Sequence, residues 1–395
     1  MPARALPGRV KFAPMTLQIR PVTSSRDLRR FIDVPWRLFD AKRHPQWVPP
    51  LRIAVRDVLD ARKHPFWRGA ERALFVAERD GRPVGRIAAI HNRAHNEFHG
   101  DHLGFFGFFE CADDAEAARA LLDAARGWLR ARGLTAMRGP VNPSTNYECG
   151  VLVDGFEHHP VLMTTWNPPY YDALLEGAGV AGAKDLLGWW LERFGEGGRE
   201  FTLPPAYAAH AARAREQTGL VFRDLVPARL DEEIAVCWEV YNDAWEPNWG
   251  FVPMTREEFA HLGAELKQLL DPRFAVAAEV DGRPAGFAIA LPDFHLLFKR
   301  IGNGRLFPTG LFTLLAGRRD IRTLRMMVLG VRKEYRTRGI FALFAHELIR
   351  RGLEAGMTGA EASWVLEDNV LMNRPLAAMG ATPYRRWRLY EGALS

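Results

Sequence analysis

The segment that decides the fold is residues 324–356, LRMMVLGVRKEYRTRGIFALFAHELIRRGLEAG. Its first eight residues form a short apolar run bounded by charge, which predicts a buried strand. A basic turn follows at residues 332–339, and from Ile340 apolar side chains recur at the spacing of an amphipathic helix until Gly356 ends it. Because the first amide N–H groups of a helix are unpaired and its dipole favours negative charge there, such a corner is suited to bind phosphate.

The elements after this helix complete a recognisable pattern. A strand is predicted at residues 362–366, followed by a short helix and a last strand at residues 383–390. This order resembles the GNAT superfamily of acyl-CoA N-acyltransferases. The signature turn of that family is matched by residues 336–339, and its later Asn and Gly are matched by Asn369 and Gly380. The resemblance implies an α/β (α+β) fold, in which a mixed, mostly antiparallel sheet is flanked by helices.

Two positions depart from the superfamily pattern. Phe341 stands where the family has a small residue, which bears on how closely a pyrophosphate can approach. Leu376 stands where the family usually has the tyrosine that protonates the departing thiolate. The resemblance therefore assigns no general acid.

The N-terminal half repeats the same order of elements but lacks the basic turn. The turn before its helix at about residues 115–132 carries three carboxylates, which would repel a pyrophosphate at a helix N-terminus. Two tandem GNAT-like domains are therefore predicted, of which only the second keeps an acyl-CoA site. The predicted parts are a disordered N-terminus at 1–15, a degenerate domain at 16–193 with residues 184–191 as its closing strand, a Gly/Pro-rich linker at 194–206, and the acyl-CoA-binding domain at 207–395.

Polar residues are concentrated at residues 138–150, RGPVNPSTNYECG. Residues of these types either cap turns or line a pocket. Glu148 stands out, because a carboxylate with apolar neighbours has a raised pKa and could take a proton from an ammonium substrate. Asn146 is a candidate substrate contact in the same motif.

The loop at residues 241–253 is aromatic and rich in Asn. The resemblance implies that the equivalent segment of the superfamily shapes the acceptor site, and the candidate contacts here are Asn242, Trp245 and Trp249. The alternative is a packed loop that covers the core.

An insertion at residues 292–322 carries large apolar side chains, Phe298 among them, rimmed by Arg and Lys. This pattern fits an interfacial segment with rings in acyl chains and cations at lipid phosphates. It fits equally a covering flap whose apolar face packs on the protein. In either arrangement the insertion could line an apolar channel, which makes Phe298 a candidate substrate contact.

The resemblance also implies where the cosubstrate and the chemistry lie. The pyrophosphate side of acyl-CoA would be held by Arg336, Thr337, Arg338, Gly339, Ile340, Phe341 and Asn369. A backbone N–H between Leu329 and Val331, where the superfamily splays its central strands, would polarise the thioester carbonyl. The candidate proton-transfer residues are the bases Glu148 and Glu367 and the acids Tyr384 and Tyr390. Neither a metal nor a permanently bound cofactor is expected, since acyl-CoA is a cosubstrate.

Charge and cysteine content limit the classes of partner and the cellular compartment that are expected. A formal net charge of +6 suits an acidic partner, either a phosphorylated cofactor, an anionic membrane or nucleic acid. Because the sequence has neither zinc-type Cys or His spacing nor a nucleic-acid module, nucleic acid is not expected. Three dispersed cysteines indicate a reducing compartment, and no apolar run reaches the roughly 20 residues that a membrane-spanning helix needs. A cytoplasmic protein is expected, with any contact to the inner membrane peripheral.

The complete pattern resembles a family of bacterial tandem-GNAT proteins that includes ceramide synthases. That resemblance implies transfer of a long-chain acyl group from CoA, or from an acyl carrier protein, to a primary amine such as a sphingoid base. Two alternatives stay open, a small-molecule N-acetyltransferase and a non-catalytic acyl-CoA-binding module.

Overall fold

The computed structural model describes residues 16–193, 200–245 and 248–394, so the N-terminus that was expected to be disordered lies outside the described residues. The N-terminal half contains β1 (Leu17–Pro21), α1 (Ser25–Leu38), α2 (Arg52–Val58), η1 (Pro65–Arg68), β2 (Ala70–Arg79), β3 (Arg82–Asn92), α3 (Arg93–His99), β4 (Leu103–Cys111), α4 (Ala115–Arg130), β5 (Ala136–Gly139), β6 (Val141–Asn142), β7 (Glu148–Cys149), β8 (Val151–Asp154), α5 (Tyr171–Gly177) and β9 (Ala181–Glu192).

The C-terminal half contains α6 (Pro205–Thr218), β10 (Val221–Asp224), η3 (Pro227–Arg229), α7 (Leu230–Trp245), α8 (Arg256–Lys267), η4 (Pro272–Phe274), β11 (Ala275–Val280), β12 (Arg283–Pro292), α9 (His295–Ile301), η5 (Leu306–Gly310), α10 (Leu311–Gly317), η6 (Arg318–Asp320), β13 (Thr323–Val331), η7 (Lys333–Arg338), α11 (Ile340–Glu354), β14 (Gly359–Leu366), α12 (Val370–Ala378) and β15 (Thr382–Ala393).

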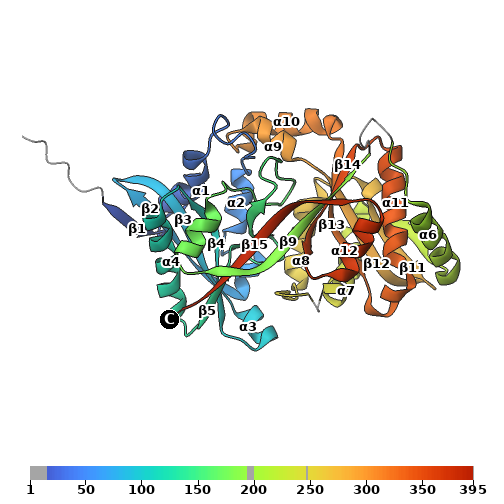
Figure 1. The fold of residues 1–395 in the computed structure, drawn as a ribbon, viewed down its shortest axis with the longest axis horizontal. Coiled ribbons are helices and arrows are strands. Elements are labelled where there is room, and N and C mark those ends of the chain that lie inside the picture. The colour runs from blue at the N-terminus through green and yellow to red at the C-terminus, as the bar shows by residue number, and fades with distance from the viewer. Residues whose placement is uncertain (1–15, 194–199, 246–247, 395) are drawn as a thin grey trace, which may run out of the picture.

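One sheet of thirteen strands runs through both halves (Figure 1). Its order is β1-β2-β3-β4-β5-β15-β9-β14-β13-β12-β11-β10, with β8 paired to β15. The pairs β4–β5 and β13–β14 are parallel, and the other pairs in this sheet are antiparallel. The predicted fold class, a mostly antiparallel mixed sheet flanked by helices, is confirmed.

The two halves exchange their last strands. β9, from the N-terminal half, pairs with β14 of the other half, and β15, from the C-terminus, pairs with β5, where Tyr390 faces Gly139. Residues 184–191 do form a strand, but it does not close the sheet of its own half as the sequence analysis expected. Alternation along a strand predicts that strand and one buried face, whereas it does not specify the partner. The domain boundary at residues 194–206 stays a prediction, and residues 194–199 lie outside the described part of the chain.

The decisive segment folds as predicted in its strand and helix. Residues 324–331 lie in β13, and α11 buries Ile340, Phe344 and Leu348, all at most 6% exposed, as the helical spacing required. The basic turn differs from expectation because it forms the 3-10 helix η7. Along β11 alternate side chains face opposite ways: Ala275 and Ala277 pack with residues of α7, whereas Val276 and Ala278 pack with residues of α11. Helices α7 and α11 therefore cover opposite faces of the sheet.

Candidate functional site

The turn that leads into α11 is suited to bind an anion. Gly339 precedes the helix with φ +73°, the left-handed region that favours glycine, and no described side chain caps the helix. Thr337 and Arg338 are exposed beside it, and the Arg338 guanidinium lies 5.2 Å from the centre of the Tyr335 ring. The start of α11 therefore presents amide N–H groups and positive charge to solvent.

Arg336, in contrast, is turned inward. Its Nη2 donates to the carbonyl of Asp243 at 3.1 Å and to that of Ala244 at 2.8 Å, both at the C-terminal end of α7. The side chain is half-buried and fixes α7 to the turn. The motif match predicts that the Arg336 charge meets the pyrophosphate, and that role stays a prediction that these contacts do not favour.

A helix that the sequence analysis did not single out lies against the same turn. α6 packs on α11, and a Cβ added to Gly339 would lie 2.8 Å from Ala214 Cβ and 3.2 Å from His210 Nε2. His210 is exposed, so an imidazole flanks the anion-binding corner. The Gly/Pro content predicts a linker through Pro204 and Pro205, whereas in the structure Pro205 begins α6, and a proline at the first helical position is itself a start signal.

The central strands β13 and β14 separate next to this corner. Their parallel pairing runs from Thr323↔Gly359 to Met326↔Ala362, and within the described residues no β13–β14 pair follows. Beyond that point β14 pairs with β9, while Leu329 and Val331 pair with β12. A gap therefore opens between residues 327–331 and 363–366, at the place where the sequence analysis put the carbonyl-binding amides.

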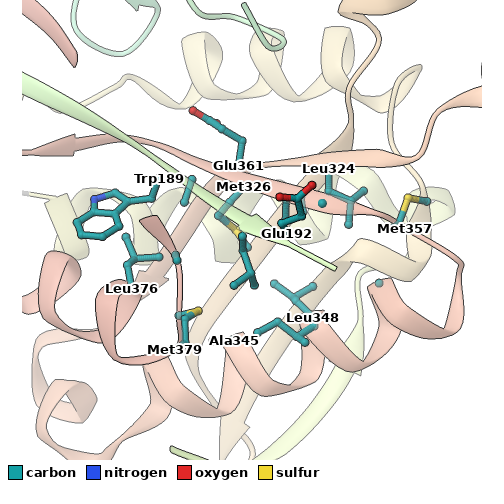
Figure 2. Close-up of a pocket in the computed structure, with 18 of the residues that line it drawn as sticks. Trp189, Glu192, Leu324, Met326, Ala345, Leu348, Met357, Glu361, Leu376 and Met379 are labelled. Carbon is teal, nitrogen blue, oxygen red and sulfur yellow. The ribbon is translucent and has the colours of Figure 1, made fainter. Parts of the chain in front are cut away.

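An apolar pocket lies beneath α11 and α12, beside the point where the strands part (Figure 2). Its cavity volume is about 120 Å³. The lining side chains are nearly all apolar and include Trp189, Leu324, Met326, Leu329, Phe341, Ala345, Leu348, Met357, Met372, Leu376 and Met379. The two departures from the family pattern, Phe341 and Leu376, are thus pocket residues.

Charged side chains are buried on the opposite side of the same strands. Figure 2 shows Glu361 directed away from Leu376 and Met379. Arg325, Glu361 and Arg385 are at most 2% exposed. Several buried polar atoms here have no hydrogen-bond partner among the described residues: Arg325 Nε, Glu361 Oε1, Trp364 Nε1, Tyr384 OH, Arg385 Nε and Arg385 Nη1. Since each such atom costs about 1–3 kcal/mol, substrate or water is expected to supply hydrogen bonds here.

The electrostatics of this buried cluster favour neutral groups. Burial raises the pKa of Glu361 to about 7, and the charge of Arg325 opposes that shift. Burial likewise raises the pKa of Asp293 to about 6 and lowers that of His295 to about 3. A carboxyl group that titrates near neutral pH is suited to exchange protons with an amine.

Glu148 belongs to the same surroundings. Burial raises its pKa to about 7, opposed by Arg325 and by a hydrogen bond to Asn142. Arg325 of the C-terminal half thus interacts electrostatically with Glu148, which the sequence predicts as a candidate base, and with Glu361, which the sequence does not single out. In β14 a small residue stands on either side of Glu361. The same pattern occurs in strands with one face in solvent, so the sequence does not indicate that Glu361 is buried.

The other predicted proton-transfer and cofactor residues lie elsewhere. Glu367 is exposed, and its Oε1 accepts the Asp185 amide at 3.2 Å. Tyr390 is buried in the core of the N-terminal half and donates to Asp172. Asn369 caps α12, its Oδ1 accepting the Met372 amide at 3.2 Å. The roles assigned to these residues stay predictions.

The polar motif and the aromatic loop, which belong to different halves, meet in space. The Tyr241 hydroxyl donates to Asn146 Oδ1 at 2.9 Å, and Asn146 Nδ2 donates to the Val252 carbonyl at 3.1 Å. Asn242 bonds both backbone groups of Met254. The remaining loop candidates pack: Trp245 on Gly330 of β13, and Trp249 under the Arg138 guanidinium at 4.2 Å.

The insertion is docked on the N-terminal half and also exposes apolar side chains. Phe298 is buried in a cluster that includes Val48 and Leu162, as the covering-flap alternative requires. Phe307, Phe312 and Leu315 are at least 64% exposed. Figure 1 shows α9 and α10 along one edge of the molecule, above the junction of the halves. No described helix is long and apolar enough to cross a bilayer.

Comparisons with known proteins fit this architecture. No family profile matches the chain. It is 36% identical over 385 residues to the bacterial ceramide synthase of Caulobacter vibrioides, covering 96% of this chain and 98% of that protein. It is 35% identical over 383 residues to protein YghO of Escherichia coli, covering 94% of each.

Solved structures share the fold at low sequence identity. A tandem GNAT protein from the clavulanic acid biosynthesis pathway matches with a TM-score of 0.56 and 15% identity, over 96% of this chain and 99% of that one. The GCN5-related glucosamine N-acetyltransferase region of a fungal multi-domain β-N-acetylglucosaminidase matches with a TM-score of 0.55 and 15% identity, over 96% of this chain and 38% of that one. These two matches establish a tandem GNAT fold.

Proposed function

Because the chain belongs to the bacterial tandem-GNAT family that includes bacterial ceramide synthase, we propose that it transfers a long-chain acyl group from a CoA thioester to the primary amine of a sphingoid base. Family membership makes it an acyl-CoA-dependent N-acyltransferase. The chain length and the acceptor are the proposed parts.

The observation that carries the proposal is the apolar pocket beside the gap between β13 and β14. A thioester whose carbonyl lies between residues 329 and 331 would place its acyl chain against Leu329, Met326 and Phe341, which line that pocket. At about 120 Å³ the cavity resembles the roughly 150 Å³ cavities that accept a benzene-sized guest, so it takes only part of a long chain as it stands. Four lining methionines, flexible and unbranched, can move to admit the rest: Met326, Met357, Met372 and Met379.

The nucleotide end of CoA is assigned to the corner before α11. There the amides of residues 338–341 and the exposed Arg338 would hold the pyrophosphate, with His210 as a further donor. Phe341 then does not hinder the phosphate, because its side chain faces the apolar pocket.

The acceptor is assigned to the opposite face of the sheet, in the cluster around Arg325. The amine must be neutral to attack the thioester carbon, and Glu148 or Glu361, both with a pKa of about 7, would take its proton. The carbon–nitrogen bond forms, the carbon–sulfur bond breaks, and the thiolate leaves with a proton. Tyr384 is the favoured donor, because its hydroxyl is buried without a partner among the described residues, whereas that of Tyr390 is held by Asp172.

Peripheral contact with a membrane is the second part of the proposal. Phe307, Phe312 and Leu315 are exposed on the insertion, whose exposed cations include Arg305 and Arg319. A membrane surface would deliver a sphingoid base, whose long chain is poorly soluble in water.

The test is turnover with defined thioesters. The purified protein is incubated with palmitoyl-CoA and sphinganine, the amide is measured by mass spectrometry and the released thiol by a colorimetric reagent. One amide per thiol is expected with palmitoyl-CoA, and much slower release with acetyl-CoA. Efficient acetyl transfer without palmitoyl transfer would replace the proposal by a small-molecule acetyltransferase. Tight palmitoyl-CoA binding without turnover on a panel of amines would replace it by a binding module.

A further inference from the structure

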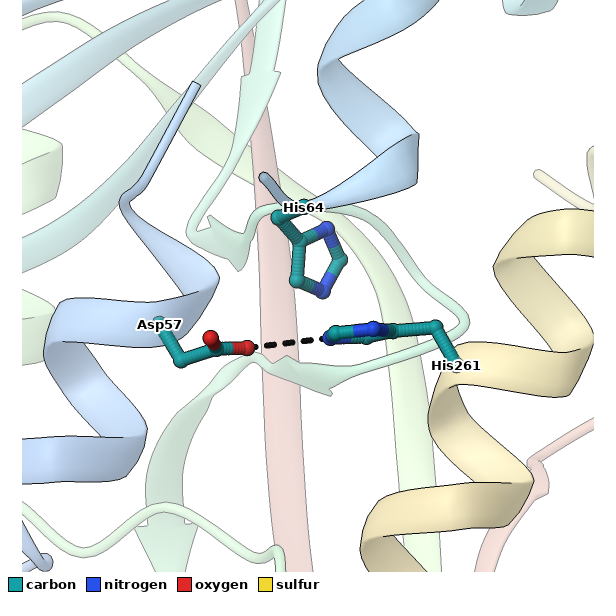
Figure 3. A group of neighbouring side chains, drawn as sticks. All are labelled: Asp57, His64 and His261. Atoms are coloured by element: carbon teal, nitrogen blue, oxygen red, sulfur yellow. Dashed lines mark hydrogen bonds and ion pairs between the residues drawn. The ribbon is translucent and has the colours of Figure 1, made fainter. Parts of the chain in front are cut away.

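Side chains of metal-ligating types from the two halves meet away from the sites described above. Asp57 lies in the last turn of α2 and His64 just before η1, whereas His261 lies on α8 of the other half. His261 Nε2 is 3.0 Å from Asp57 Oδ2, and the rings of His64 and His261 are 4.7 Å apart at 75° (Figure 3). One donor atom from each residue lies within 4.8 Å of the others.

His64 is the residue that an ion pair does not explain. It is 2% exposed, and its Nδ1 is buried with no partner among the residues that the structure describes. Figure 3 shows its other ring nitrogen directed toward His261. The nitrogen that faces His261 is therefore the one that could bind a metal shared with Asp57 and His261, whereas the unpaired Nδ1 lies on the other side of the ring.

A second carboxylate stands at the same place. Glu265, one turn after His261 on α8, has Oε1 3.8 Å from His261 Nε2. Oxygens of Asp57 and Glu265 thus lie 3.0 and 3.8 Å from the same nitrogen of His261, and a cation bound there would neutralise the two like charges.

We propose that Asp57, His64, His261 and Glu265 bind a divalent transition metal of the zinc class, and that the metal fastens the two halves together. Imidazole nitrogen and carboxylate oxygen are ligands of tetrahedral zinc, at about 2.0–2.2 Å from the ion. Tetrahedral donors at that distance are about 3.3 Å apart, so the 3.0 Å pair is already in place and the other donors close in by side-chain rotation. Asp57 and His261 side chains are 33% and 27% exposed, which gives an ion access from solvent.

The site is structural rather than catalytic. The His64 ring packs against Tyr147, whose hydroxyl donates to Glu258 of α8 at 2.9 Å. Tyr147 precedes Glu148 in the polar motif, and α8 follows the aromatic loop. A bound metal would therefore hold both acceptor-side segments in register without touching the reacting atoms.

Metal content and stability test the proposal without any activity measurement. The full chain is purified without a histidine tag and without chelator, and its metals are measured by plasma mass spectrometry. About one equivalent of zinc is expected. After dialysis against EDTA, zinc sulfate should raise Tm by several degrees, and cobalt chloride should give the visible absorption bands of tetrahedral Co²⁺.

Variants locate the site. His64→Asn and His261→Asn should each lower the zinc content roughly tenfold, whereas His102→Asn, at an exposed histidine, should leave it unchanged. If the two variants fold poorly, titration of the EDTA-treated wild type decides by itself. A wild type that holds less than about a tenth of an equivalent of metal, and shows neither a Tm shift nor cobalt bands, overturns the proposal and leaves an ion pair between Asp57 and His261.

Discussion

Arg325 Nε lies 3.7 Å from a carboxylate oxygen of Glu361, and the two side chains are 3% and 0% exposed. The residues are partners in the parallel pairing of β13 and β14, one position before that pairing ends. Glu148 of the N-terminal half also interacts with Arg325. A buried cation at the parting of the central strands therefore connects the two halves electrostatically, and this connection explains why the C-terminal domain alone would lack part of the proposed acceptor side.

Glu361→Gln will remove part of the pH dependence of stability. Burial raises the pKa of Glu361 from 4.5 to about 7. A raised folded-state pKa contributes stability that is fully present below about pH 4.5 and is lost as the pH rises through about 7, by linkage about 3 kcal/mol for this group. Urea unfolding at pH 5, 6, 7 and 8 should show a free energy of unfolding that falls with pH in the wild type and falls less in the variant. The exposed Glu367→Gln is the control, and equal slopes in all three proteins would contradict the expectation.

Gly339→Ala will weaken CoA binding, and backbone strain alone will not explain the effect. The φ of Gly339 is +73°, and the added Cβ would lie 2.8 Å from Ala214 Cβ, so α6 and the start of α11 must move apart. Gly282→Ala is a matched control, because Gly282 has φ +74° and open space around the added atom. Gly282→Ala should lose about 1 kcal/mol of stability from its left-handed backbone, and Gly339→Ala should lose more, because the two helices must also move apart. Calorimetry should show a Kd for CoA raised roughly tenfold in Gly339→Ala alone, and an unchanged Kd would remove the corner from the binding site.

Ala345→Phe will shorten the acyl chain that the protein accepts. Ala345 lines the apolar pocket from α11, so a ring there fills space that the proposal assigns to the chain. The kcat/KM with palmitoyl-CoA should fall at least tenfold, about 1.4 kcal/mol, while butanoyl-CoA is retained. Overpacking costs about 1–3 kcal/mol of stability, which is monitored by Tm. Ala378→Phe, at an exposed position of α12, is the control. An equal loss for every chain length would place the acyl chain elsewhere.

The sequence predicts the local elements of this fold better than their partners. β13 is predicted by the apolar run before the basic turn, and α11 by the spacing of Ile340, Phe344 and Leu348. Burial of one helix face requires apolar residues at regular spacing, which is visible in the sequence. The exchange of β9 and β15 has no such signal in the sequence, since the alternating side chains of each strand could be buried equally well beside either half. The continuous sheet was therefore beyond what the pattern encodes.

The candidate site divides in the same way. Glu148 could be predicted because it lies in a short run of polar residues next to an apolar segment, which is visible in the sequence. Glu361 and His210 were missed, since their significance depends on contacts with Arg325 and Gly339, far away in the chain. Arg336 matches a sequence motif, yet its guanidinium bonds the end of α7. A motif match specifies which residue type occurs, whereas the direction of its side chain depends on tertiary packing.

Replacing Phe312 and Leu315 together by Ser will reduce binding to anionic vesicles. These side chains are 71% and 66% exposed on α10, and burying each in a bilayer interface contributes of the order of 1 kcal/mol. Co-sedimentation with vesicles that contain phosphatidylglycerol should show partitioning lowered roughly tenfold. Val221→Ser, at a 64% exposed position of β10, should change nothing. If the double variant binds as the wild type does, the insertion is a covering flap only.

Substitution of Arg336 and Arg338 will separate a structural from a binding role within the same turn. Arg336 bonds two carbonyls at the end of α7, so Arg336→Gln should leave two partly buried acceptors without this donor and lower the free energy of unfolding by about 1 kcal/mol. Arg338 is exposed, so Arg338→Gln should leave stability unchanged while it weakens CoA binding and makes that binding less sensitive to salt. Chemical unfolding and CoA titration at two ionic strengths measure both properties on both proteins. If Arg336→Gln alters only the CoA affinity, the Arg336 guanidinium of the wild type must turn outward to the pyrophosphate when ligand binds, as the motif alone suggests.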